Sequence, residues 1–162
     1  MKIVRRHPLS PKQRRKLAKS LVDVLSETRI ETLLAGNLEE ASVDKTPVIL
    51  SDGEPVIFLV SGEAFPTLRG FLRTGVERRF LVVDMGAVPH IANGADVMAP
   101  GVVEVDLRLR SGDLCVVVDE RHRKPLCIAR MLVDAEGLKQ MERGKVAENI
   151  HHVGDRLWKA EK

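Results

Sequence analysis

Residues 84–102 of the chain read DMGAVPHIANGADVMAPGV, and two Gly-Ala pairs in it, Gly86-Ala87 and Gly94-Ala95, frame a very short predicted helix. Pro89 suits the first turn of that helix, where a missing N–H group costs no hydrogen bond. The apolar residues 80–84 that lead into it have the composition of a strand. Because glycine permits positive φ angles and the close approach of another backbone, the pattern predicts a strand that delivers a glycine-flanked helix to a phosphate or to a sugar edge.

The chain after this stretch alternates between predicted strands and turns. Residues 103–110 alternate apolar and charged side chains with a period of two, which predicts one half-buried strand. Further along we expect a turn at 111–113, buried strands at 114–118 and 125–132 around a polar loop at 119–124, a short helix at 134–141 and a final strand at 144–152.

Three features together resemble the PUA domain, a small RNA-binding pseudo-barrel. They are the pattern D-x-GA-x6-GA-x-x-M-x-PG from Asp84, the Gly112-Asp113 turn, and RGKVAENIHHVGDRLW at residues 143–158. With its N-terminal part, which contains FPTLR at residues 65–69, the whole chain resembles the malignant T-cell-amplified-sequence proteins and their archaeal translation-associated counterparts. The resemblance implies an α+β fold, with an N-terminal α/β pre-PUA domain at residues 1–76 and a PUA pseudo-β-barrel with short helices at residues 77–158.

The composition excludes several classes of protein. With 44% hydrophobic residues, the 162-residue chain can bury one ordinary core or two small ones, but no apolar run approaches the length of a membrane span. The first residues are basic without the apolar segment of a secretory signal, so we expect a cytoplasmic protein with no membrane partner. The sequence has no P-loop, no GxGxxG that opens a helix, no GxSxG and no HExxH, and no acid–base pair. We therefore expect a binding protein without catalytic residues or cofactors.

The cysteines and histidines do not form a metal motif. Cys115 and Cys127 fall in neighbouring predicted strands, and in the cytosol buried thiols are favoured over a disulfide or a metal pair. His151 and His152 are adjacent on a predicted strand, where neighbouring side chains point to opposite faces. We expect no metal site.

Positive charge is concentrated at the N-terminus. Residues 1–30 hold nine Lys or Arg and two acidic residues, a net charge of +7, whereas the whole chain has +3. Ser10 and Pro11 predict the start of a helix that reaches about Glu27. Its basic ridge is either a solvated helix face or a surface that contacts phosphates, and comprises Lys12, Arg15, Lys16 and Lys19.

An acidic, β-rich segment follows at residues 31–63. Predicted strands at 43–50 and 55–60 flank Asp52-Gly53, a dipeptide typical of hairpin turns. A helix is expected from residues 65–68 onward and is stopped at Gly75, with Leu68, Phe71 and Leu72 inward. A second basic group lies near the domain boundary and comprises Arg69, Arg73, Arg78 and Arg79. These arginines either contact RNA, keep the surface soluble or form ion pairs with the acidic segment.

The resemblance implies recognition of structured RNA, with the acceptor end of tRNA favoured, in a translation-associated role on or near the small ribosomal subunit. The implied contact residues are Gly86, Ala87, Gly94 and Ala95 for close backbone approach, Asn93 for a base edge or 2′-OH, and Arg143, Lys145 and Asn149 from the final strand. His151 shares a strand face with Asn149 if that strand is regular, and is a second-rank candidate. The alternative function is an adaptor whose pre-PUA domain docks an RNA-modification or translation partner.

Overall fold

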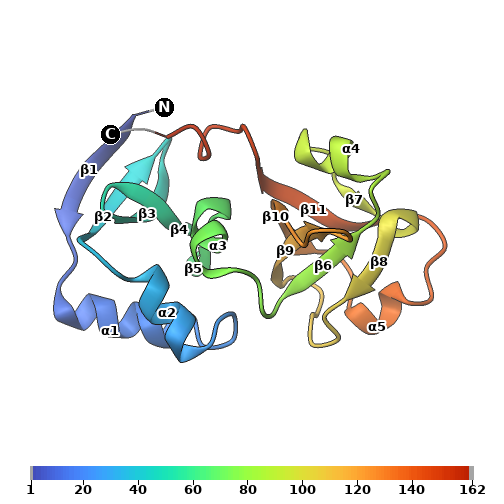
Figure 1. Ribbon diagram of the computed structural model, residues 1–162, viewed down its shortest axis with the longest axis horizontal. Coiled ribbons are helices and arrows are strands. Elements are labelled where there is room, and N and C mark those ends of the chain that lie inside the picture. Colours follow the sequence, from blue (N-terminus) through green and yellow to red (C-terminus); the bar gives the residue numbers. More distant parts are fainter. Residues whose placement is uncertain (1, 161–162) are drawn as a thin grey trace. The chain divides into compact units, whose positions relative to one another are not determined.

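The computed structural model describes residues 2–160, which form two compact units. The first unit comprises the residues up to Glu77 together with those from Gly154 onward, and the second unit comprises Arg78–Val153. The domain limits expected at residues 76 and 158 stay a prediction; by packing, residues 154–160 associate with the first unit. Figure 1 shows this last segment, in red, returning to the end of the first unit that holds β1 and β2.

The first unit contains a five-stranded antiparallel sheet in the order β1-β2-β3-β4-β5. Three two-residue turns link its last four strands, at Asp44-Lys45, Asp52-Gly53 and Ser61-Gly62, and all six turn residues have positive φ. This geometry matches the right-handed twist of the strands that each turn connects. The strands are β1 (Ile3–Pro8), β2 (Leu38–Val43), β3 (Thr46–Ser51), β4 (Glu54–Val60) and β5 (Glu63–Pro66).

The sequence prediction for this sheet is right at one turn and wrong at another. The Asp52-Gly53 hairpin is confirmed, because Ser51 pairs with Glu54 across it. The single strand expected over residues 43–50 is instead two strands that meet at the Asp44-Lys45 turn. That turn has no glycine, so the local sequence carries only a weak signal for positive φ.

Three helices accompany the sheet: α1 (Pro11–Ser20), α2 (Glu27–Leu33) and α3 (Leu68–Thr74). The expected start of α1 is confirmed, because Ser10 and Gln13 form a reciprocal capping box behind Pro11. Its expected end near Glu27 is wrong: α1 ends at Ser20 and buries no residue. The chain turns there, which brings Leu21, Val24 and Leu25 into the core.

Helix α3 packs closely against β4. Gly70 is buried, and a Cβ placed on it would overlap the backbone carbonyl oxygen of Val56. Leu68 and Phe71 face the core as expected, but Leu72 is 52% exposed, so its inward assignment is wrong. The buried side of α3 is centred on Gly70, Phe71 and Thr74, and at about 100° per residue Leu72 points away from it.

The second unit contains a six-stranded sheet in the order β7-β11-β10-β9-β6-β8, nearly closed into a barrel. Strands β6 and β9 are parallel, and every other pair is antiparallel. The expected α+β class with a PUA pseudo-barrel is confirmed. The elements are β6 (Phe80–Val83), α4 (Val88–Ala92), β7 (Val97–Met98), a 3-10 turn (Ala99–Gly101), β8 (Val102–Val105), β9 (Leu114–Asp119), β10 (Pro125–Met131), α5 (Ala135–Leu138) and β11 (Lys145–His152).

The strand expected over residues 103–110 ends early, at Val105. The Asp106 carboxylate explains why, because it accepts the N–H groups of Arg79 (2.7 Å) and Arg108 (3.1 Å) and so turns the chain. Leu109 still reaches the core, whereas Leu107 is 54% exposed.

Cys115 and Cys127 are buried free thiols in the neighbouring strands β9 and β10. Burial raises the pKa of Cys115 to about 12 and also raises that of Cys127 well above its ordinary value. Both therefore stay protonated and act as small apolar side chains. Within residues 2–160 no group of three potential metal ligands comes together, and no helix is both long and apolar enough to cross a membrane.

Candidate nucleic-acid interface

The Asp84 carboxylate holds the form of the loop between β6 and α4, residues 84–87. The Asp84 backbone N–H donates to the Gly101 carbonyl (2.9 Å), which continues the β6–β8 pairing by one residue. The Asp84 side chain then accepts the N–H of Ala87 at 2.9 Å. Asp84 is thus a turn residue. Gly86 is exposed and lies between Asp84 and Ala87, which this hydrogen bond joins.

The other end of α4 requires a glycine. Gly94 has φ +101°, and a Cβ there would lie 3.1 Å from Nε2 of His152. Asn93 caps the helix and is exposed, with its N–H bonded to the His90 carbonyl at 3.2 Å. The glycine-flanked helix predicted from the sequence is therefore present, and Asn93 and Ala95 both face solvent beside Gly94.

Asn149 on β11 holds this end of α4 in place. Its amide Nδ2 donates to the carbonyls of Ile91 (3.0 Å) and Ala95 (2.9 Å), and its backbone N–H donates to Asp96 Oδ1 (2.8 Å). These bonds fix the amide orientation and leave its buried Oδ1 without a partner among the described residues. Asn149 therefore positions α4, and its amide donors are not available to RNA.

Lys145 and Asp96 form an ion pair next to Asn149, with 2.8 Å between Nζ and Oδ2. The hydrogen bond from Lys145 and the Asn149 backbone N–H lower the pKa of Asp96, and the same carboxylate raises the pKa of Lys145. Both side chains remain partly exposed. Arg143, just before β11, is exposed and has no ion pair within residues 2–160.

His151 does not share the environment of Asn149. A bulge in β11 leaves Ile150 unpaired, because Ile128 pairs with His151 and Ala129 pairs with Asn149. The expectation of a shared face is therefore wrong. His151 is 2% exposed and lies in the interior as a structural histidine, so it is not part of the candidate surface around α4.

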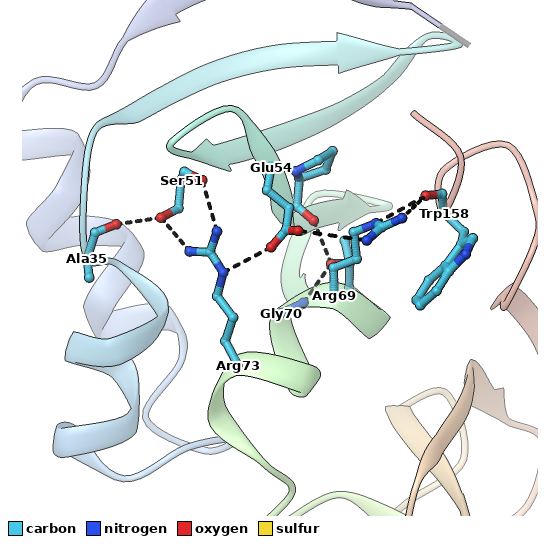
Figure 2. A network of polar contacts seen from close by, with 9 residues as sticks. Ala35, Ser51, Glu54, Arg69, Gly70, Arg73 and Trp158 are labelled. Carbon is cyan, nitrogen blue, oxygen red and sulfur yellow. Dashed lines mark hydrogen bonds and ion pairs between the residues drawn. The ribbon is translucent and has the colours of Figure 1, made fainter. Parts of the chain in front are cut away.

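Two members of the second basic group, Arg69 and Arg73, form hydrogen bonds and ion pairs with other residues of the chain, as Figure 2 shows. Arg73 donates to Glu54 (3.0 Å), to the Ser51 hydroxyl (2.6 Å) and to the Ser51 carbonyl (3.1 Å). Arg69 lies 4.3 Å from the ring centre of Trp158 and donates to the Trp158 carbonyl at 2.9 and 3.1 Å. Arg69 also approaches Glu54, at 3.7 Å. Pairing with the acidic segment, one of the alternatives the sequence left open, is what these two arginines do.

The remaining basic residues divide into bound and exposed ones. Arg79 donates to the Leu114 carbonyl at 3.2 Å and has positive φ, and Arg78 beside it is half-buried. The α1 ridge is exposed throughout, at Lys12, Arg15, Lys16 and Lys19. Arg14, which lies outside that ridge, pairs with Glu31 at 3.1 Å.

Sequence reasoning assigned no function to the loop between β9 and β10, residues 120–124. The structure places it beside the 84–87 loop, where Glu120 accepts the N–H of Met85 at 2.9 Å. The one signal in the sequence is the run Arg-His-Arg-Lys at residues 121–124. Its proximity to α4 follows from the parallel pairing of β6 and β9, which no local pattern specifies.

Comparison with known proteins gives matches over the whole chain and over its second unit. Residues 79–153 match the PUA domain family. An uncharacterized protein of Methanocaldococcus jannaschii is 39% identical over 98% of both chains. Translation machinery-associated protein 20 of Eremothecium gossypii is 31% identical over 71% of this chain and 67% of its own length. The chain belongs to the translation machinery-associated protein 20 and malignant T-cell-amplified-sequence family.

Two further matches extend this family assignment. Malignant T-cell-amplified sequence 2 of Homo sapiens is 29% identical over 71% of this chain and 66% of its own. The crystal structure of a hypothetical protein of Pyrococcus horikoshii has a TM-score of 0.83 at 35% identity and covers 95% of this chain and 98% of its own. For this member of the malignant T-cell-amplified-sequence family, the PUA domain indicates RNA binding, and no enzymatic family is indicated.

Proposed function

We propose that the chain is a non-enzymatic protein that recognises structured RNA, with the acceptor end of tRNA as its favoured ligand. The contact surface lies on the second unit, along the 84–87 loop, α4 and the start of β11. We extend the proposal to a cytoplasmic, translation-associated role on or near the small ribosomal subunit. The translation-associated part draws on the translation-machinery name of the Eremothecium gossypii relative.

The exposed backbone at Gly86 is the observation that carries this proposal. Asp84 and Ala87 are held on either side of it, so the loop keeps its form without a side chain at its outermost point. A ribose or phosphate can therefore approach the peptide backbone there.

Exposed polar groups around α4 complete the proposed surface. Asn93 presents an amide to an unstacked base edge or a 2′-OH, and Arg143 supplies positive charge for phosphates. Lys145 contributes part of its charge, since Asp96 neutralises it locally. The α1 ridge remains a separate candidate for phosphate contact in the first unit.

A bulky residue at Gly86 tests the surface directly. We expect Gly86→Trp to abolish tight binding of tRNA while Gly137→Trp, with the same bulk added at an exposed position of α5, leaves it unchanged. A Cβ at Gly86 meets only the Asp84 carboxylate at 3.3 Å, and one at Gly137 meets nothing within 4 Å, so neither meets the backbone and we expect both variants to fold. Fluorescence anisotropy with fluorescently labelled tRNA, at low and moderate salt, measures the affinities.

The ligand is tested with tRNA whose 3′ end is intact or trimmed. Tight binding that needs the intact end and is lost only in Gly86→Trp supports an acceptor-end site. Weak binding that is equal for every RNA and unaffected by Gly86→Trp contradicts the proposal, and favours an adaptor that docks a protein partner through the first unit.

A further inference from the structure

The β9–β10 loop lies at the same sheet edge as the 84–87 loop. Strands β6 and β9 run parallel with Val83 opposite Asp119, so the chain leaves both strands at one edge. The Glu120 N–H donates to the Val83 carbonyl at 3.0 Å, and the Glu120 carboxylate accepts the Met85 N–H at 2.9 Å. Glu120 therefore joins the two loops, because its N–H donates to the end of β6 and its carboxylate accepts from the 84–87 loop.

The Asp119 carboxylate fixes the form of this loop. The side chain accepts the backbone N–H groups of Arg121 (2.8 Å) and His122 (2.6 Å) on one oxygen and that of Lys124 (3.1 Å) on the other. The Asp119 carbonyl also accepts the N–H of Arg123 at 3.1 Å. Asp119 is only 4% exposed, so the loop is anchored from inside and its backbone does not need a ligand to become ordered.

The Asp119 carboxylate is turned toward the backbone of the loop, the exposed Glu120 carboxylate contacts the 84–87 loop, and the cationic side chains face solvent. Asp119 and Glu120 both accept backbone N–H groups. Arg123 pairs with Glu104 at 3.0 Å. Arg121 and Lys124 are exposed, and neither has an ion pair within residues 2–160. Two cations are thus displayed on a fixed loop that adjoins Gly86.

We propose that Arg121 and Lys124 bind the RNA phosphates that neighbour the nucleotide at the 84–87 loop. This inference rests on the proposed function and adds to it a second contact element, which extends the RNA site from α4 to the β9–β10 loop. Phosphates are the chemistry that suits these side chains, because Lys and Arg are cationic donors to phosphate oxygens and the loop has no Phe, Tyr or Trp for stacking on bases.

The test compares two double variants of the full chain that remove the same charge. Arg121→Ala/Lys124→Ala removes the proposed contacts. Arg108→Ala/Arg110→Ala removes two exposed arginines at the opposite end of β9, roughly 17 Å away along the strand. At 0.1 M salt the Debye length is about 10 Å, so the control charges act weakly on RNA at the β9–β10 loop. Affinity for intact tRNA is measured by anisotropy across a salt series.

We expect the loop variant to bind tRNA about 10-fold or more weakly than the wild type. The slope of log affinity against log salt concentration should be shallower by about 1.4 to 1.8, which is about 0.7 to 0.9 for each lost phosphate contact. The control variant keeps the wild-type slope. Equal slopes in the wild type and both variants overturn the inference, as does an equal loss in the two variants. If Gly86→Trp still abolishes binding in that case, the proposed RNA site stands without the loop; if wild-type protein binds no RNA, the proposed function fails first.

Discussion

At the scale of single residues, the Asp119 carboxylate combines near-complete burial with three hydrogen bonds from backbone N–H groups. Burial alone would raise the pKa of its carboxyl, but the N–H groups of His122, Lys124 and Arg121 together hold that pKa below its ordinary value. The carboxylate therefore stabilises the folded chain above the unfolded pKa of about 4, and this contribution is lost as the pH falls through the lower, folded-state pKa.

Replacing this carboxylate tests its role in stability. We expect Asp119→Asn to lower the free energy of unfolding by about 1–2 kcal/mol at pH 7, because the amide leaves one backbone N–H of the loop unsatisfied. The difference from wild type shrinks as the pH falls from about 4 through the lower folded-state pKa, where the carboxyl of the folded wild type takes up a proton. Urea unfolding at pH 7 and pH 3 measures both values.

The matched control for Asp119 is its neighbour. Glu120→Gln removes a charge from the same loop but changes an exposed side chain that accepts a backbone N–H from Met85. Its effect should stay within about 0.5 kcal/mol at both pH values. A larger loss in Glu120→Gln than in Asp119→Asn would contradict the anchoring role of Asp119.

At the scale of elements, the contact between α3 and β4 depends on a missing side chain. Gly70→Ala adds a methyl group that overlaps the Val56 carbonyl oxygen and lies 3.1 Å from a Leu33 methyl group. Although alanine favours helix by about 1 kcal/mol, the overlap should destabilise the chain by about 1–3 kcal/mol. Thermal unfolding of Gly70→Ala measures the loss.

Helix α5 supplies the control, because a glycine-to-alanine substitution there should not lower the stability of the chain. Gly137 does not have positive φ, and no atom lies within 4 Å of the position that an added methyl group would take. Gly137→Ala should therefore be neutral or raise stability by up to about 1 kcal/mol. A destabilised Gly137→Ala together with a neutral Gly70→Ala would show that packing on β4 does not decide the effect of a methyl group at Gly70.

Elements with a local signal could be predicted, and those set by distant pairing could not. The α4 boundaries follow from Pro89 and Gly94, and the Asp52-Gly53 hairpin follows from its turn residues. The β11 bulge at Ile150 and the parallel β6–β9 pair depend on partners far along the chain. For that reason the position of Gly94 in the candidate site was predictable, whereas the burial of His151 and the neighbourhood of Arg121 were not.

At the scale of the whole molecule, the segment after Val153 belongs to the first unit through Trp158. The Arg69 guanidinium lies over its ring, and Arg156 pairs with Asp44 at 2.7 Å. Trp158→Ala removes the ring, so we expect the first unit to lose about 0.5–2 kcal/mol of stability. Hydrogen exchange should rise in α3 and β4 and stay unchanged in β9 and β10.

The control for Trp158 lies one residue further along. Lys159 is exposed, and its hydrogen bond to the Asp155 carbonyl uses its backbone N–H, so Lys159→Ala should leave the exchange pattern of wild type intact. Faster exchange in β9 and β10 of Trp158→Ala, or no change in α3, would contradict the assignment of this segment to the first unit.

The division of the chain also sets an order of events during synthesis. The second unit is continuous from Arg78 to Val153, so all of its residues leave the ribosome before Trp158 does. The first unit begins earlier, yet Arg69 and Asp44 meet their partners in the final segment only after the second unit has been made. We expect a nascent chain to finish folding in its middle before it finishes folding at its beginning.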